Sequence, residues 1–275
     1  MRYKITLSYD GSRFCGWQLQ PDVTTVQGCL EKALSTLLGG EVSVTGAGRT
    51  DTGVNAVGYV AHFDTDRALE AEEFRYKLNA ILPHEIIVHE VVEVVGSDIA
   101  ASGFHARFSA IRREYTYFLH RSKDPFIREH SYLYTFPLDV EAMNQAAAML
   151  VGRHDFRCFQ KTGSDVKTSI CTVQEAFWAP YTPTHVGLMH FDATPEQYLY
   201  FRISADRFLR NMVRAVVGSL LEVGRGRRSV ESFAKLILPA DDSADAATME
   251  GAGRSDAGES VPGHALFLSG VDYQE

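Results

Sequence analysis

A glycine-framed block at residues 46–54 contains the residue types most able to do chemistry. Within it Arg49 and Asp51 stand two residues apart, inside a frame of three glycines. Glycines permit positive φ and let another molecule approach the main chain. A nearby arginine keeps a carboxylate ionised, so the block is typical of a site at which Asp51 acts as a charged group. The same letters are also typical of an ordinary turn, and both interpretations stay open at this point.

Three known motifs can be compared with this block. A dinucleotide fingerprint would need a third glycine where Asp51 stands, and a P-loop counted from Gly48 would need Lys and Ser/Thr where Val54-Asn55 stand. An aspartic protease needs two Asp-Thr/Ser-Gly motifs to pair its carboxylates. The chain has one, because Asp10-Gly11-Ser12 lacks the hydroxyl residue between Asp and Gly.

Composition favours a folded protein of two domains. The chain has 275 residues, of which 45% are hydrophobic, and no apolar run reaches membrane-spanning length. The N-terminus leads directly into an alternating strand rather than a signal peptide. The four cysteines form no CxxC pair and the ten histidines no HExxH motif. We therefore expect a cytoplasmic protein without a metal, a cofactor or a membrane partner.

The net charge of −8 is unevenly distributed. Residues 239–275 hold eight carboxylates against Arg254 alone, so residues 1–238 are close to neutral. Seven arginines lie within 202–228, and a second basic cluster spans 107–128. Basic clusters of this kind are compatible with binding to phosphate groups. The candidate phosphate-binding arginines in these clusters are Arg107, Arg112, Arg113, Arg207 and Arg214.

Periodicity in the first part of the chain indicates alternating strands and helices. Residues 3–9 alternate as in a half-buried strand, and Thr25 is a suitable N-cap for a helix that ends at Gly39-Gly40. A strand at 59–63 places Asp51 in the loop before it. A helix around 74–81 and a strand at 86–95 complete α/β order.

A second unit begins like the first, with an alternating strand at 113–119. We place the boundary near 104–112 and expect an N-terminal α/β domain at 1–108 and a C-terminal one at 109–275. The later elements that we expect are helices at 139–151 and 208–223, an aperiodic and mobile acidic insertion at 241–260, and a last strand at 265–271. On the helix at 208–223 we expect the arginine stripe Arg207, Arg210 and Arg214 to lie apart from the apolar stripe.

Six segments in this order resemble the TruA-type tRNA pseudouridine synthases over nearly the whole chain. They are Tyr9-Asp10-Gly11 with Gly16-Trp17-Gln18, Thr25-Val26-Gln27-Gly28, the block at 46–54, Phe104-His105-Ala106-Arg107-Phe108-Ser109-Ala110, Tyr115-Thr116-Tyr117, and Phe208-Leu209-Arg210-Asn211-Met212-Val213-Arg214. The resemblance implies an α+β enzyme of two related ferredoxin- or RRM-like domains, with a basic active-site cleft between them. It implies a homodimer that isomerises uridine to pseudouridine at positions 38, 39 and 40 of the tRNA anticodon arm, without cofactor or metal.

The resemblance also implies roles for particular residues. Asp51 takes the place of the catalytic aspartate, and Arg210 that of the arginine which pairs with it. Arg49 then helps to displace the base from its stack, which costs a few kcal/mol. Tyr115 matches the tyrosine that stacks on the uracil, an interaction worth about 1–3 kcal/mol. Leu266 matches an apolar pocket residue, although a leucine in a terminal strand is equally typical of a core.

The chain departs from the family pattern at Thr52, Asn55, Cys171 and Ala265, where bacterial members commonly have Ala, His, Arg and Gly. None of these positions is a proposed catalytic residue. The competing hypothesis is a non-catalytic RNA-binding protein, which would need the basic clusters but not Asp51. The acidic insertion would repel phosphate, so we expect it to lie away from bound RNA.

Overall fold

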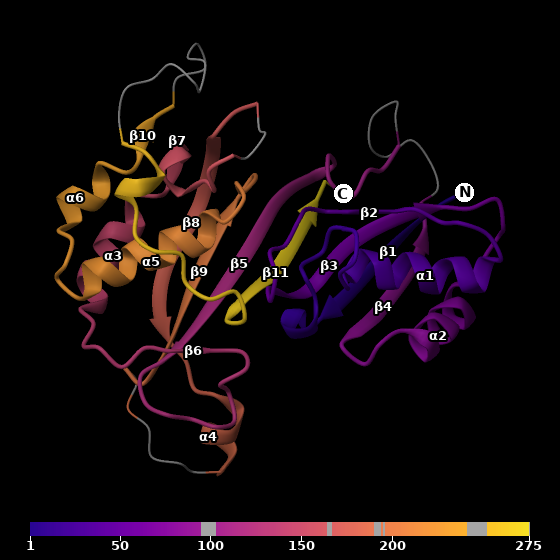
Figure 1. The fold of residues 1–275 in the computed structure, drawn as a ribbon, viewed down its shortest axis with the longest axis horizontal. Coiled ribbons are helices and arrows are strands. Elements are labelled where there is room, and N and C mark those ends of the chain that lie inside the picture. Colours follow the sequence, from indigo (N-terminus) through magenta and orange to yellow (C-terminus); the bar gives the residue numbers. More distant parts are fainter. Residues whose placement is uncertain (95–102, 164–166, 190–193, 195, 241–251, 275) are drawn as a thin grey trace. The chain divides into compact units, whose positions relative to one another are not determined.

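The computed structural model describes all residues except 95–102, 164–166, 190–193, 195, 241–251 and 275. The chain forms two compact units. Unit 1 comprises Met1–Arg113 and Phe267–Glu275, and unit 2 comprises Glu114–Leu266. Most of the last strand belongs to unit 1, and its first residue, Leu266, belongs to unit 2. The mixed α/β class is confirmed (Figure 1).

Unit 1 has the βαββαβ order of a ferredoxin-like fold. Its antiparallel strands follow the order β4-β1-β3-β2, and the end of the chain adds β11 parallel to β3. Helices α1 and α2 lie side by side (Figure 1). The elements are β1 (Arg2–Tyr9), η1 (Gly11–Arg13), α1 (Val26–Leu38), β2 (Val44–Gly46), β3 (Asn55–Asp64), α2 (Ala71–Ile81), β4 (Ile86–Glu93) and β11 (Leu266–Tyr273).

Unit 2 is also a sheet with helices packed on it. Its strands follow the order β10-β7-β8-β9-β5, with β6 beside β5, and α3 packs against β8 and α5. The elements are β5 (Ala110–His120), β6 (Tyr132–Leu133), α3 (Val140–Ala148), β7 (Gly152–Asp155), η2 (Arg157–Phe159), β8 (Ile170–Pro180), α4 (Thr184–Met189), β9 (Tyr198–Ala205), α5 (Met212–Gly224), α6 (Val230–Ala234), β10 (Leu238–Pro239) and η3 (Arg254–Asp256).

Local signals in the sequence account for several of these elements. In β1 every second side chain is buried, as its alternation predicts. Thr25 caps α1 by accepting a hydrogen bond from Gly28 N at 3.2 Å, and Gly39 ends the helix in the left-handed conformation, with φ of 76°. Asp139 caps α3 in the same way as Thr25 caps α1, by accepting from Ala142 N at 2.9 Å.

The helix predicted at 208–223 is wrong in its first turn. Helix α5 begins at Met212, because Asn211 adopts φ of 66° and so breaks the right-handed helical path. Arg207 and Arg210 therefore precede the helix, and the expected arginine stripe on one helical face does not exist. Of the three arginines, only Arg214 lies on α5.

The prediction of a mobile insertion at 241–260 is wrong for its second half. Residues 241–251 lie outside the described part of the chain, but 252–260 are held against α5. Gly258 N donates to Ser219 Oγ at 2.8 Å, and Asn211 Nδ2 donates to Ser260 Oγ at 2.6 Å. The composition of a segment indicates only how little apolar surface the segment can bury by itself. It does not show contacts such as these, which a neighbouring helix provides.

Two glycines of the 46–54 block have different structural requirements. A Cβ on Gly46 would lie 2.2 Å from Tyr59 Oη and 2.6 Å from Trp17 Cε2, whereas a Cβ on Gly48 would meet no atom within 4 Å. Both aromatic rings are buried and packed, so neither can move aside cheaply.

We expect Gly46→Ala to destabilise the protein by about 1–3 kcal/mol, because overpacking forces buried rings to shift. Gly48→Ala, the matched control, should leave stability nearly unchanged. Thermal and denaturant unfolding of the two variants measures the difference. Equal stability of the two variants would contradict this account of Gly46.

Candidate active site

Asp51 lies in the loop between β2 and β3, as the sequence predicts. The side chain is half-buried, and Val54 N donates to Asp51 O at 3.1 Å to close the turn that leads into β3. Gly53 in this turn has φ of 77°, a conformation that favours glycine. The carboxylate is therefore presented by a tight turn at the start of a long strand.

Two buried tyrosine hydroxyls hold the loop on either side of Arg49. Tyr59 Oη donates to Gly48 O and accepts from Gly48 N at 3.4 Å. Tyr9 Oη and Thr50 Oγ1 share a hydrogen bond of 2.9 Å. Both tyrosines are at most 4% exposed. A buried hydroxyl that loses its hydrogen-bond partner costs free energy. These contacts therefore fix the path of the loop.

The segment after β1 holds the other end of the loop. Trp17 N donates to Thr50 O at 3.2 Å, and Gly53 N donates to Phe14 O at 3.4 Å. Asn55, one of the departures from the family pattern, accepts from Gly11 N through Oδ1 at 2.8 Å and is 1% exposed. The motif at residues 9–18 therefore serves as the support for the loop that carries Asp51.

Arg49 lies on the exposed side of the same loop. Its Nε donates to Gln18 Oε1 at 3.2 Å, which links it to the supporting segment. An exposed guanidinium beside a half-buried carboxylate gives this face of unit 1 both a cation and an anion. A substrate that carries phosphate and a reacting carbon needs groups of both kinds.

In unit 2 the structure places Tyr115 on β5, where it is half-buried. The ring packs edge-to-face on Phe208, with centroids 5.0 Å apart and an interplanar angle of 88°. Leu266, the first residue of β11, is only 4% exposed. The contact with Phe208 therefore helps to fix the orientation of the Tyr115 ring.

Arg210 lies in an irregular segment, 206–211, that links β9 to α5. Asp206 anchors the start of this segment, because its Oδ1 accepts from Thr172 N at 2.8 Å and its own N donates to Thr172 O at 3.1 Å. Lys161 N donates to Arg210 O at 3.0 Å. The Arg210 side chain is exposed while its backbone is held.

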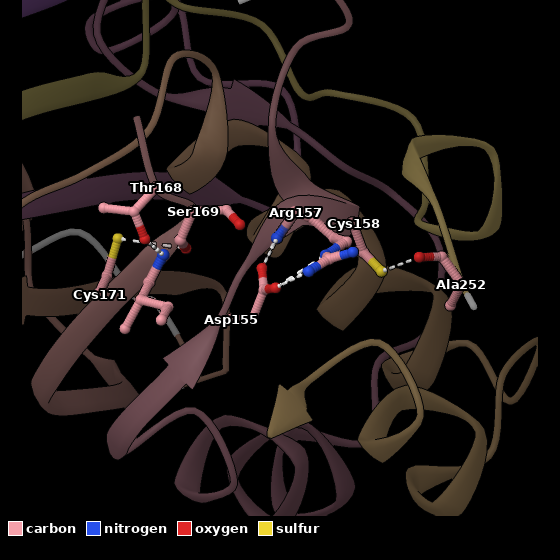
Figure 2. Close-up of polar contacts among 8 residues, drawn as sticks. Asp155, Arg157, Cys158, Thr168, Ser169, Cys171 and Ala252 are labelled. Carbon is pink, nitrogen blue, oxygen red and sulfur yellow. Dashed lines mark hydrogen bonds and ion pairs between the residues drawn. The ribbon is translucent and has the colours of Figure 1, made fainter. Parts of the chain in front are cut away.

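Lys161 follows η2, which a buried ion pair stabilises (Figure 2). Asp155 accepts from Arg157 N at 2.9 Å and from Arg157 Nε at 2.7 Å. Burial opposes ionisation of Asp155, but hydrogen bonds from Arg157 and Ser169 outweigh it and lower the pKa of the carboxyl.

Cys171, another departure from the family pattern, is buried on β8, and burial raises the pKa of its thiol to about 12. The thiol is therefore unreactive.

The arginines expected to contact RNA differ in how far the fold already uses them. Arg107 is exposed, whereas Arg112 forms an ion pair of 2.9 Å with Asp272. Arg113 donates to the carbonyl oxygens of Ala110 and Arg107, at 2.7 and 2.6 Å. In unit 2, Arg214 Nε donates to Val261 O at 2.7 Å, and Arg207 is half-buried. The side chains of Arg113 and Arg214 therefore already serve the fold, because both donate hydrogen bonds to backbone carbonyl oxygens.

Comparison with known proteins identifies the family. A family described as tRNA pseudouridine synthase matches residues 5–104 and 146–274. The tRNA pseudouridine synthase A of Bacteroides thetaiotaomicron is 45% identical over 274 residues, which cover 100% of this chain and 91% of the relative. That of Bacillus subtilis is 40% identical over 277 residues, covering 99% of each chain. The chain belongs to the tRNA pseudouridine synthase family.

Within this member of the tRNA pseudouridine synthase family, sequence reasoning did not find the residues that hold the loop. Alternation assigns Tyr59 and Tyr9 to strands, and Tyr9 also belongs to a family motif, but neither pattern indicates the partner of a hydroxyl. Phe208 was quoted as part of a motif without a role. No group of three or more His, Cys, Asp or Glu suited to a metal lies among the described residues, and none of the helices described there is long and apolar enough to span a membrane.

Tyr59→Phe isolates the hydroxyl contact, because the ring and its stacking on Trp17 at 4.1 Å remain. We expect faster amide hydrogen exchange at residues 48–53, since Gly48 loses both of its contacts to the hydroxyl. Tyr273→Phe is the matched control in unit 1: it removes a hydroxyl that donates to Ala106 O at 2.7 Å. Unchanged exchange at 48–53 in Tyr59→Phe would show that the hydroxyl does not hold the loop.

Proposed function

We propose that this protein isomerises uridine to pseudouridine in tRNA, with Asp51 as the reacting carboxylate. Membership of the family supports the assignment of the reaction. The hydrogen bonds that hold the loop support the assignment of Asp51 as the reacting residue. The reaction breaks the bond between C1′ and N1, turns the uracil and forms a bond between C1′ and C5. No atom is gained or lost, so the proposal needs neither a redox group nor a metal.

Asp51 suits this role because its loop is fixed before any substrate arrives. A reacting carboxylate contributes most when its geometry is set in advance, since ordering it during the reaction would add to the barrier. Asp51 attacks C1′ or first acts as a base, and one carboxylate serves either route. Arg49, on the exposed side of the loop, helps to hold the displaced nucleotide.

Three further residues belong to the proposed site by resemblance to the family. Tyr115 stacks on the turned uracil, which offsets much of the cost of unstacking it. Arg210 provides the cation that pairs with Asp51, and Leu266 provides an apolar wall. We extend the proposal to positions 38, 39 and 40 of tRNA, to a homodimer and to a cytoplasmic location. Domains at 1–108 and 109–275 that enclose a basic cleft remain part of this hypothesis.

Asp51→Asn should lower turnover at least about a hundredfold, because the amide can neither attack carbon nor accept a proton at neutral pH. Release of tritium from tRNA labelled at uracil C5 measures the reaction directly. Asp66→Asn, which changes an exposed carboxylate in the same unit, is the matched control and should be active. A non-catalytic RNA-binding protein would release no tritium even as wild type, while it would still bind the labelled tRNA.

Tyr115 variants separate stacking from proton transfer. Tyr115→Phe keeps the ring, so we expect uracil stacking to persist and any loss in kcat to report the hydroxyl. Tyr115→Leu should lose about 1–3 kcal/mol of stacking as well. Single-turnover rates of the two variants give the comparison. If the leucine variant reacts as fast as the phenylalanine variant, Tyr115 does not stack on the base.

A further inference from the structure

Phe108 is an unusually exposed aromatic residue at the tip of a turn, residues 105–109, in unit 1. Its side chain is 75% exposed. The guanidinium of Arg107 lies 5.4 Å from the ring centroid, and the ring of His105 lies 4.4 Å away at an angle of 35°. A cation near an aromatic ring is attracted to the ring, so the exposed Phe108 side chain has a polar neighbour that interacts with it favourably.

The turn that carries Phe108 is closed by its own hydrogen bonds. Ser109 N donates to His105 O at 2.9 Å, and His105 N donates to Ser109 Oγ at 3.0 Å. His105 Nδ1 accepts from Arg107 N at 3.2 Å and from Phe108 N at 3.3 Å. Burial, and then the charge of Arg2, lowers the pKa of His105.

The base of the turn is attached to the core of unit 1. Ala106 N donates to His62 Nδ1 at 3.1 Å, and Tyr273 Oη donates to Ala106 O. Arg113 Nη2 donates to Arg107 O at 2.6 Å. The backbone around Phe108 is therefore ordered in the free protein, and a ligand that binds to the ring need not order the turn.

We propose that Phe108 and Arg107 form a stacking platform for an unpaired base of the bound tRNA. The proposal rests on tRNA being the substrate. A nucleobase stacked on an aromatic side chain contributes about 1–3 kcal/mol whatever its sequence, and an adjacent arginine can bind the phosphate that follows. In this arrangement Phe108 adds affinity through its ring and Arg107 adds affinity through its charge.

A nucleobase fits this surface better than a second copy of the chain does. A stable protein interface buries roughly 800 Å² on each partner and is depleted of charge at its centre. Phe108 is instead a single ring at a tip, with the guanidinium of Arg107 5.4 Å from its centroid and the ring of His105 4.4 Å from it. A flat base needs only one ring face and benefits from the cation.

The experiment measures binding of an unmodified tRNA transcript to Phe108 variants. We expect Phe108→Ala and Phe108→Leu to raise Kd roughly 5- to 100-fold, because both remove the ring, and Phe108→Trp to stay within about twofold of wild type. Phe126→Ala is the matched control, since Phe126 is 77% exposed in unit 2 beside His185. Its Kd should equal that of wild type.

Salt dependence distinguishes the two members of the platform. Arg107→Ala should reduce the slope of log K against log salt by about one, whereas Phe108→Leu should shift affinity equally at every salt concentration. In Phe108→Trp, bound tRNA should also quench the emission of the introduced, exposed tryptophan, whereas the native Trp17 and Trp178 are 2% and 3% exposed and so shielded from contact with RNA.

A Kd for Phe108→Leu within twofold of wild type overturns the platform, as does an equal loss in Phe126→Ala. Dissociation of a dimer by Phe108→Leu, with tRNA affinity retained, assigns the ring to a second copy and also overturns it. Tritium release is measured on the same preparations. Failure of the wild type to release tritium counts against the proposed reaction, while an active wild type with an unaffected Phe108→Leu counts against the platform alone.

Discussion

The contact between the Tyr59 hydroxyl and Gly48 is the constraint on which the Asp51 loop depends. It couples the loop to the core of unit 1 through the pairing of β1 with β3. Leu7 lies opposite Tyr59 in that pairing, and Tyr9 lies two residues further along β1, so both tyrosines point to the same face. Their rings are 5.6 Å apart. A slip of one residue between β1 and β3 would place the two tyrosines on opposite faces of the pair, so only one hydroxyl could still reach the loop.

Core side chains form hydrogen bonds to backbone groups of the Asp51 loop and its support that would otherwise have no partner. One hydroxyl serves both the N–H and the carbonyl of Gly48, and the Asn55 amide serves Gly11 N. Each unsatisfied group would cost about 1–3 kcal/mol, so the loop has few alternative conformations. A reacting carboxylate is expected to be held rigidly. Here the rigidity of its loop comes from hydrogen bonds between core side chains and the backbone, and not from ion pairs.

Much of the fold could be predicted from sequence wherever the signal was local. Alternation located β1, Thr25 and Asp139 marked helix starts, and Gly39 marked a helix end. The prediction failed at Asn211, because a left-handed φ is not visible in the spacing of side chains. It also assigned no element to β8 and β9, whose pairing contains an irregularity between Val173 and Glu175 that interrupts the period of two.

The sequence indicated candidate site residues but not the residues that support them. Arg49 was identified by its place beside Asp51, but its contact to Gln18 could not be read from spacing, because the two lie 31 residues apart. The same holds for the glycines of the block. Gly46 is required by Trp17 and Tyr59, and Gly53 by its φ, so only Gly48 lies where a Cβ would face open space. At Gly46 the frame is thus clearance for the protein's own aromatic core, whereas Gly48 faces open space next to the exposed Arg49.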